Sequence, residues 1–464
     1  MKITFDGAAR TVTGSKHLIE VNGSKLLLDC GLFQGRRADT YQRNQSFSFD
    51  PKSIDAVVLS HAHIDHSGNL PNLVKNGFEG PIYATPPTAT LGNIMLQDAG
   101  HIQESDIAYV NKKRARRGEP SVEPLYTVAD AVKAVEHYYP VNYNESFSPV
   151  PGVEVHFYDA GHILGSAAIR LDIDEKGARK SLWFSGDIGR SDLPLITNPV
   201  LPSDVDYLLM ECTYGDMEHF TVEEAFESFK AAVIKTFNRG GKVIIPAFAV
   251  GRTQEIVYFL NRLISDGEIR PVPVYVDSPL AVEASKIFRQ YPEYFDAETN
   301  TFIRENHHPA LDFEGLTYIS SVEESKALNN KHEPMVIISA SGMAETGRIL
   351  HHLKNNVENP RNMVLIVGWQ APDTLGRRLV EGAKELSIFG QRFEVRAEVQ
   401  TIHGLSAHAG QDFLLKYAAA VNGRAKKIFL VHGEEDAATA FMAKLDEKRI
   451  GPYEYPILNE TVEF

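Results

Sequence analysis

Three histidines and one aspartate stand within six consecutive positions near the start of the chain. The stretch LSHAHIDHSGNL follows the apolar run AVV, so His61 is predicted where a strand runs out into a loop. Residues two apart in an extended loop project to the same side, so His61 and His63 can converge on one metal ion. Asp65 and His66, at the entry to a helix, can then bind a second ion. Imidazoles and carboxylates are the ligands that zinc binds when no thiolate is used, so the cluster predicts a metal site.

Further ligand-type residues follow other predicted strands. His162 comes after VEVHFYDAG, Asp187 after SLWFSG and His432 after KKIFLV. One such residue alone is more often a cap or a turn, but several strands that each end in a ligand indicate a shared site at the strand ends. Asp29 in LLLDCG is another, with a carboxylate suited to orienting a metal ligand. Because a carboxylate can bridge two metals and an imidazole cannot, Asp187 is the expected bridge.

The pattern of apolar residues divides the chain into parts with two different secondary-structure patterns. Up to about Gly215 it reads as short β-type runs separated by Gly, Asp and Asn. Thr221 and Glu224 then form a predicted capping box, and helices and strands alternate as far as Phe393. Strand character returns in RFEVRAEVQTI and KKIFLV. The 464 residues are too many for one ordinary core, so we expect an α/β unit inserted within, or appended to, a β-rich one.

Composition limits the cell compartment and the partners. The chain has two cysteines, no apolar run of the roughly 20 residues that span a bilayer, and no secretory signal at its start. We therefore expect a cytoplasmic protein without a membrane partner. A net charge of −14 argues against a chain that coats itself with nucleic acid. It leaves room for a local basic site, and NKKRARRG, Asn111 to Gly118, is read either as a solvated surface segment or as a phosphate contact.

Together these residues resemble the motifs of a known family. Asp29, HAHIDH, His162 in AGHILGSA and Asp187 in FSGD are similar to the first four motifs of the metallo-β-lactamase superfamily. YLLMECTYGD, GLSAHAG and LVHGE resemble motifs A, B and C of its β-CASP branch of nucleic-acid nucleases. The resemblance implies an α/β fold, an αββα metallo-β-lactamase sandwich with an inserted α/β β-CASP domain. The expected domain limits are residues 1–214 and 394–464 for the sandwich and 215–393 for the insertion.

The resemblance also implies a site and an activity. Two zinc ions are expected, with Asp187 between them; the expected ligands are His61, His63 and His162 for one ion and Asp65, His66 and His432 for the other. Asp65, Glu211 and His408 are the expected catalytic residues, with His408 as general acid and Glu211 orienting it. The expected activity is ribonuclease cleavage to 5′-phosphate and 3′-hydroxyl ends, endonucleolytic, 5′-exonucleolytic or both. Members that act on RNA carry His at motif C, so His432 favours RNA over DNA, and single-stranded RNA is the expected partner.

Some details stay open at this point. Arg252, Ser341 in SASGM and Ser406 are candidate substrate contacts, each with an equally good reading as a turn or surface residue. His351 and His352 lie in the helix expected over residues 345–357 and are expected to be packing or surface residues. Cys212 and Met217 depart from the family pattern, which usually has Ser or Thr and often Arg there; the departures affect only local substrate contacts. A homo-oligomer is a candidate assembly.

Three other functions compete with the ribonuclease hypothesis. A thioesterase or lactonase of the same superfamily would share the metal ligands but would not need the long insertion or motif B. A non-catalytic RNA-processing scaffold would be expected to lose ligands, and this chain keeps all of them. A flavin-dependent diiron oxidoreductase would need a different ligand set and an added flavin domain.

Overall fold

A computed structural model describes residues 1–35 and 37–464, without the side chains of residues 37–39. The chain divides into two compact units. Unit 1 comprises Met1–Ser191, Asn198–Glu218 and His408–Phe464, and unit 2 comprises Asp192–Thr197 and His219–Ala407. No helix in the described part of the chain is both long and apolar enough to cross a membrane.

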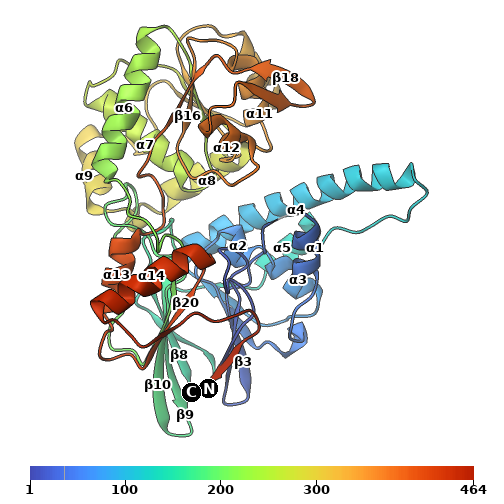
Figure 1. Ribbon diagram of the computed structural model, residues 1–464, viewed down its shortest axis with the longest axis vertical. Helices are drawn as coiled ribbons and strands as arrows, with labels where there is room; N and C mark the ends of the chain where they lie inside the picture. The colour runs from blue at the N-terminus through green and yellow to red at the C-terminus, as the bar shows by residue number, and fades with distance from the viewer. Residues whose placement is uncertain (36) are drawn as a thin grey trace. The chain divides into compact units, whose positions relative to one another are not determined.

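Unit 1 is built on two seven-stranded sheets (Figure 1). The first has the order β22-β1-β2-β3-β4-β5-β6, with β1 (Lys2–Phe5), β2 (His17–Val21), β3 (Ser24–Leu28), β4 (Ala56–Val58), β5 (Ile82–Ala84), β6 (Tyr138–Pro140) and β22 (Thr461–Glu463). The second has the order β21-β20-β11-β10-β9-β8-β7, with β7 (Ser146–Val150), β8 (Val153–Asp159), β9 (Ala167–Glu175), β10 (Ala178–Phe184), β11 (Tyr207–Glu211), β20 (Lys427–Val431) and β21 (Tyr453–Glu454). Alternate residues of both sheets meet in one buried core, which includes Phe5, Leu28, Phe157 and Phe429.

Helices cover the outer face of each sheet of unit 1. The helices are α1 (Arg37–Gln45), α2 (Ile64–Ser67), α3 (Leu70–Lys75), α4 (Pro86–Ala115), α5 (Val128–Val135), α13 (Gln411–Ala419) and α14 (Glu435–Lys448), with a 3₁₀ turn η1 (Pro51–Ser53). Leu70 and Leu73 of α3 pack against Leu27 and Val57 of the first sheet. Tyr417 of α13 packs in the second outer core, where its hydroxyl accepts a 2.6 Å hydrogen bond from Trp183 Nε1. The layers are thus helix, sheet, sheet, helix, which confirms the αββα expectation.

The strand directions explain why the expected ligands meet at one edge. Strands β3, β4 and β5 run parallel, as do β10, β11 and β20. Strand β8 has the same direction as β10, because β9 pairs antiparallel with both. Their carboxyl ends therefore lie on one side of the sandwich, and each of the expected ligands follows such an end.

Unit 2 contains a six-stranded parallel sheet in the order β14-β13-β15-β12-β16-β19. The strands are β12 (Val243–Pro246), β13 (Val274–Asp277), β14 (Leu316–Ile319), β15 (Val336–Ser339), β16 (Met363–Ile366) and β19 (Glu398–Thr401), with a separate hairpin of β17 (Glu385–Ile388) and β18 (Gln391–Glu394). The helices are α6 (Val222–Asn238), α7 (Arg252–Ser265), α8 (Pro279–Gln290), α9 (Ala297–Asn306), α10 (Val322–Ala327), α11 (Ile349–Asn356) and α12 (Leu375–Val380), with 3₁₀ turns η2 (Pro292–Tyr294) and η3 (Leu328–Asn330). The capping box of Thr221 and Glu224 is present at the start of α6, as predicted. The insertion of an α/β domain is confirmed.

Three local expectations differ from the structure. The part of the chain before Gly215 reads as β-type runs, yet residues 86–115 form the long helix α4, whose second half is exposed and so lacks an apolar stripe. The expected helix from Glu345 begins only at Ile349, because Ala344 (φ 56°) and Gly347 (φ 81°) hold a left-handed turn before it. Strand β19, expected in the sandwich, pairs with β16 in unit 2. The division between the units thus falls near residues 218 and 407, and the limits 214 and 393 stay predictions for the domains.

Candidate metal centre

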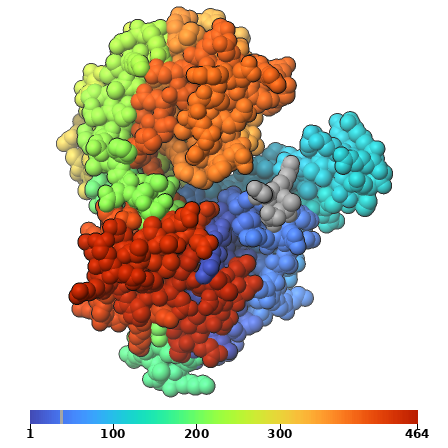
Figure 2. Space-filling view, viewed as in Figure 1, coloured from blue at the N-terminus to red at the C-terminus, as the bar shows by residue number. Residues whose placement is uncertain are grey.

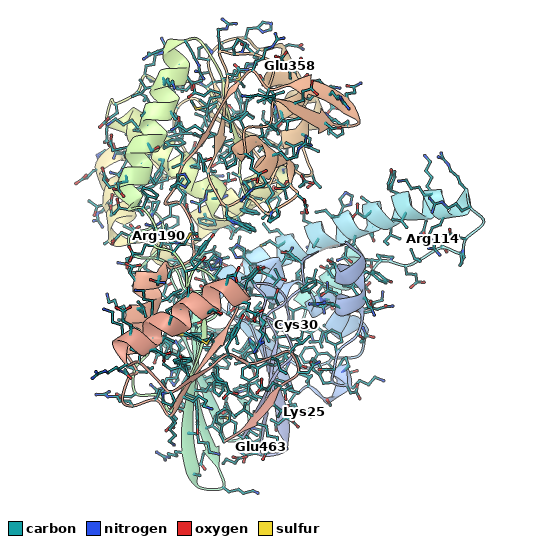
Figure 3. All side chains as sticks on the ribbon, in the orientation of Figure 1. Lys25, Cys30, Arg114, Arg190, Glu358 and Glu463 are labelled. Carbon is teal, nitrogen blue, oxygen red and sulfur yellow. The ribbon has the colours of Figure 1, made fainter. Side chains whose placement is uncertain are left out.

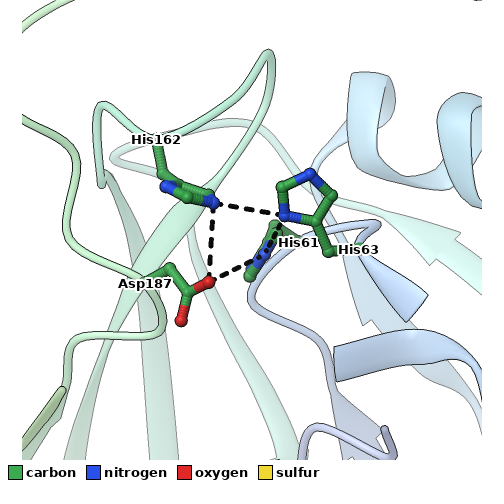
Figure 4. A group of neighbouring side chains, drawn as sticks. All are labelled: His61, His63, His162 and Asp187. Carbon is green, nitrogen blue, oxygen red and sulfur yellow. Dashed lines mark hydrogen bonds and ion pairs between the residues drawn. The ribbon is translucent and has the colours of Figure 1, made fainter. Parts of the chain in front are cut away.

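Four side chains form the first group at the strand ends of unit 1 (Figure 4). The nitrogen His63 Nδ1 lies 3.1 Å from His61 Nε2 and 3.2 Å from His162 Nε2. The oxygen Asp187 Oδ2 lies 3.5 Å from the same two Nε2 atoms of His61 and His162. Three ring nitrogens and one carboxylate oxygen therefore face one point, and the structure brings together all four residues that the sequence assigned to this position.

A second group lies beside the first and consists of Asp65, His66 and His432. His66 Nε2 is 3.3 Å from His432 Nε2, and His432 Nε2 is 3.4 Å from Asp65 Oδ2. The other oxygen of the shared carboxylate, Asp187 Oδ1, lies 3.1 Å from His66 Nε2. Asp187 thus presents Oδ2 to the first group and Oδ1 to the second, which is the arrangement expected of a bridging ligand.

The chemistry of these donors fits divalent cations. Burial lowers the pKa of His61 and His162 well below the ordinary value, so both rings are neutral and offer lone pairs. Burial alone would raise the pKa of Asp187, but the neighbouring His432, His66 and His408 hold this pKa well below the usual range. In the first group, neutral imidazole nitrogens 3.1–3.2 Å apart, with an ionised carboxylate beside them, are the donor set of a zinc-type site. His63 and Asp65 are only half-buried, so solvent reaches the two groups from the side on which these two residues lie.

Behind the second group, Asp29 fixes the orientation of a ligand. This residue is fully buried, and its Oδ2 lies 2.7 Å from His66 Nδ1. The same carboxylate accepts hydrogen bonds from the backbone N–H and the hydroxyl of Ser60 and from the hydroxyl of Ser15, at 2.8–3.0 Å. Such a partner on the far nitrogen leaves Nε2 free for a metal.

Two hydroxyl residues support ligands in the same way and were missed by the sequence analysis. Ser60 Oγ lies 3.1 Å from His61 Nδ1. Thr213 Oγ1 lies 3.1 Å from His432 Nδ1 and donates a 2.9 Å hydrogen bond to the carbonyl of His432. Ser60 adjoins a ligand in sequence, and that adjacency is the only sequence signal for it. Thr213 stands 219 residues from His432, and its place in motif A is the only sequence signal for it.

A glutamate and a histidine from distant segments form a pair at the edge of the centre. His408 Nδ1 lies 3.1 Å from both carboxylate oxygens of Glu211, which is fully buried at the end of β11. Glu211 also accepts a hydrogen bond from the backbone N–H of Ile188, next to Asp187. His408 Nε2 is 3.8 Å from Asp187 Oδ2 and thus faces the metal ligands. Burial alone would lower the pKa of His408, but Glu211 and Asp187 together raise it to about 9.

The three expected substrate contacts lie in unit 2 and are described only within it. Arg252 is buried at the start of α7 and forms an ion pair with Glu255, so it is not a surface residue. Ser341 Oγ accepts hydrogen bonds from the backbone N–H groups of Glu345 and Thr346, at 3.1 and 3.3 Å. Ser406 is half-buried. Their roles toward a substrate stay predictions.

A buried polar network holds the turn that carries Ser341. Asp277, at the end of β13, is fully buried and lies 2.6 Å from each of three donors: Ser325 Oγ, Arg348 Nη1 and His352 Nε2. Burial would raise the pKa of Asp277, but hydrogen bonds from His352, Ser325 and Arg348 outweigh it and lower the pKa. His352 is therefore a packing residue, as expected.

The two departures from the family pattern are local. Cys212 is buried, with its thiol 3.5 Å from the carbonyl of Val431 on the neighbouring strand β20. A serine or threonine hydroxyl there would lie beside the same carbonyl. Met217 is 46 % exposed. Neither residue belongs to the ligand groups.

Three protein-family models match the chain. They are described as a metallo-β-lactamase superfamily domain (residues 18–177), a Beta-Casp domain (residues 253–379) and a Zn-dependent metallo-hydrolase RNA specificity domain (residues 392–454). A solved structure of a protein of unknown function from Enterococcus faecalis aligns with a TM-score of 0.58 over 99 % of both chains. Its 14 % sequence identity shows a shared fold only.

Curated relatives align along nearly the whole chain. The Thermus thermophilus protein named ribonuclease TTHA0252 is 38 % identical over 441 residues, which cover 95 % of each chain. An RNase J-like protein of Methanocaldococcus jannaschii is 31 % identical and covers 95 % of this chain and 94 % of its own. The transcription termination factor FttA of Methanosarcina mazei is 32 % identical over 97 % of this chain and 69 % of its own. With these matches and the seven clustered candidate ligands, the chain belongs to the β-CASP branch of the metallo-β-lactamase superfamily.

Proposed function

We propose that this protein is a metal-dependent ribonuclease that hydrolyses phosphodiester bonds of single-stranded RNA to 5′-phosphate and 3′-hydroxyl ends. One observation carries the proposal: the Glu211–His408 pair stands beside the seven-residue ligand set, with His408 Nε2 turned toward Asp187. A thioesterase or lactonase of the superfamily needs the ligands but not this pair. A relative of similar length that is named a ribonuclease supports the same activity.

Two zinc ions are the cofactors that we propose. His61, His63 and His162 would hold one ion and Asp65, His66 and His432 the other, with Asp187 shared. The chemistry that such ions supply when bound is activation of a water molecule and stabilisation of negative charge on phosphate oxygens. Asp65 contributes as an ionised carboxylate: burial would raise its pKa, but hydrogen bonding and charge from His432 and His66 lower it to about 2.

The leaving 3′-oxygen needs a proton, and His408 is placed to donate it. Glu211 accepts from Nδ1, which leaves Nε2 as the nitrogen that carries a proton toward the centre. Positioned proton donors of this kind contribute about 10²–10⁴-fold to rate. Glu211 acts as a positioning residue, because its carboxylate binds both the imidazole and the backbone beside Asp187.

The further proposals concern the partner, the assembly and the cellular location of the protein. RNA is the partner that we propose, and sedimentation measurements test the candidate homo-oligomer. A cytoplasmic location agrees with Cys30 and Cys212, which are both free and buried. Because the ligand set is complete, a scaffold that has lost catalysis is disfavoured.

The test combines metal analysis with cleavage of labelled RNA. Purified protein supplemented with zinc is expected to hold two ions per chain and to leave a 5′-phosphate on its product. His408→Ala is expected to slow cutting about 10²–10⁴-fold while the metal content stays the same; loss of metal would make His408 structural. Faster turnover of thioesters or lactones than of RNA would overturn the proposal. A circular RNA substrate separates endonuclease from 5′-exonuclease, because only an endonuclease opens a circle.

A further inference from the structure

The helix α4 begins at the metal centre and ends far from it. Its first turn is fixed by the hydroxyls of Thr85 and Thr88, which donate hydrogen bonds of 2.6 and 2.8 Å to the carbonyl of Gly165. Gly165 lies three residues after the ligand His162. With 30 residues and a rise of 1.5 Å per residue, α4 is about 45 Å long. One element thus connects the metal-binding loops to a distant part of unit 1.

The second half of α4 and the segment after it stand out from the rest of unit 1, and we call residues 101–122 the arm. In Figure 2 the arm forms a projecting lobe, and Figure 3 shows Arg114 near its end. The returning segment braces the helix: Asn111 exchanges two 2.9 Å hydrogen bonds with the backbone of Val122, and Arg114 Nε donates to the carbonyl of Pro120 at 2.7 Å. These hydrogen bonds fix the returning segment against the helix and make the arm rigid.

The end of the arm is strongly basic in an otherwise acidic protein. Five cationic residues occur within six positions, and they are Lys112, Lys113, Arg114, Arg116 and Arg117. Arg114 forms an ion pair with Glu119 at 3.2 Å, and the other four are exposed. The whole chain has a net charge of −14, so this end attracts polyanions that the average surface repels.

Helix stability alone does not explain so many cations. Basic residues in a last turn gain about 0.3–1 kcal/mol each from the helix dipole, and the effect falls off beyond that turn. Arg116 is the C-cap of α4 and Arg117 lies past it. Nearby, Tyr109 is 56 % exposed, with Lys113 Nζ 4.4 Å from its ring centroid. Exposed aromatic rings among cations are typical of surfaces that bind single-stranded nucleic acid.

We propose that the arm binds the phosphates of an RNA strand at a distance from the cleavage site, with a base of the strand stacked on the ring of Tyr109. The inference rests on the proposed ribonuclease function, since it concerns how the same substrate is held. A stacked strand advances about 3.4 Å per nucleotide, so the 45 Å length of α4 corresponds to about 13 nucleotides. A stacked RNA strand that occupies the metal centre and also reaches the arm must therefore exceed about this length.

The four exposed cations set the size of the expected effect. For single strands, the slope of log affinity against log salt is about −0.7 per phosphate contact, so four contacts contribute about −2.8. Between 50 and 200 mM salt this amounts to about a 50-fold change in affinity. The arm variant replaces Lys112, Lys113, Arg116 and Arg117 by Gln, which keeps a good helix former at each position. The matched control replaces four other exposed cations of unit 1 by Gln: Arg179, Lys416, Arg424 and Lys448.

Binding is measured in a His408→Ala background, in which RNA survives, with labelled single-stranded RNAs of about 30 and about 8 nucleotides. The arm variant is expected to bind the long RNA more weakly than its parent at about 50 mM salt. Its salt slope is expected to be flatter by up to about 2.8, so the deficit shrinks by up to about 50-fold between 50 and 200 mM salt, while the short RNA binds as before. In the background with His408 intact, the arm variant is expected to cut the short RNA normally and to cut the long RNA with raised KM and unchanged kcat.

Three results would overturn the inference. Long-RNA binding could be unchanged in the arm variant, or reduced equally in the control variant, or reduced for both RNA lengths alike. If the arm variant instead loses binding to polyglutamate and keeps RNA binding, the arm belongs to an acidic protein partner. A protein that cuts neither RNA refutes the proposed ribonuclease, and the binding slopes still decide the role of the arm.

Discussion

The pair of Glu211 and His408 offers the sharpest test of how the centre works. Glu211 is fully buried, and its carboxylate accepts from the imidazole of His408 and from the backbone N–H of Ile188. Replacing Glu211 by Gln keeps an oxygen for Ile188 but removes the negative charge beside His408. The change therefore removes one charge-assisted hydrogen bond and leaves the backbone contact in place.

The expected magnitude follows from that single contact. A hydrogen bond to a charged group contributes about 1.5–3 kcal/mol, and each 1.36 kcal/mol is tenfold in rate, so Glu211→Gln should lower kcat about 10- to 160-fold. His408→Ala should cost about 10²–10⁴-fold, the full contribution of a proton donor. If Glu211 acts only through His408, the double variant should be no slower than His408→Ala alone.

The assay is single-turnover cleavage of 5′-labelled RNA at neutral pH, with metal content measured on each protein. Glu218→Gln is a matched control, because Glu218 follows the same motif and is exposed. Effects that multiply in the double variant would refute the reasoning, since they would give Glu211 a role independent of His408. A fall in metal content in Glu211→Gln would refute it as well.

Three other predictions concern stability and reactivity. Burial is the main cause that lowers the pKa of His17 to about 3. The stability that neutral His17 contributes to the folded state is therefore fully present above pH 6.5, its ordinary pKa, and is lost as the pH falls toward 3. By pH 5 about 2 kcal/mol is lost, and urea unfolding should show that His17→Leu removes this component. Burial raises the pKa of the Cys30 thiol to about 12 and also raises that of Cys212, so alkylation followed by mass spectrometry should label neither thiol in the folded protein between about pH 7 and 9 and both in urea. Asp277→Asn should destabilise unit 2 by about 3–5 kcal/mol, because it breaks a buried ion pair, and calorimetry should show the lowered transition.

Four of the seven candidate ligands could be predicted from sequence because their geometry is local. His61, His63, Asp65 and His66 lie on one short loop and helix start, where spacing alone decides which side chains converge. The alternation of strands and helices in unit 2 could also be predicted from the sequence, because buried parallel strands are short apolar runs.

Features set by distant contacts were not readable in this way. Strand β19 joins the sheet of unit 2 through β16, and no local pattern distinguishes it from a strand of the sandwich. Thr213 supports His432 from 219 residues away. The exposed half of α4 has no apolar periodicity, because little packs against it, so the strongest sign of a helix is missing there.

Strands β11 and β20 are neighbours in one sheet, yet the whole of unit 2 after His219 separates them along the chain. A ribosome that adds about 5–20 residues per second needs roughly 10–40 s to synthesise the intervening stretch of about 200 residues. Throughout that interval the nascent chain contains the ligands from His61 to Asp187 but lacks His432. The order of synthesis therefore keeps the candidate metal centre incomplete while the ribosome is still reading most of the message.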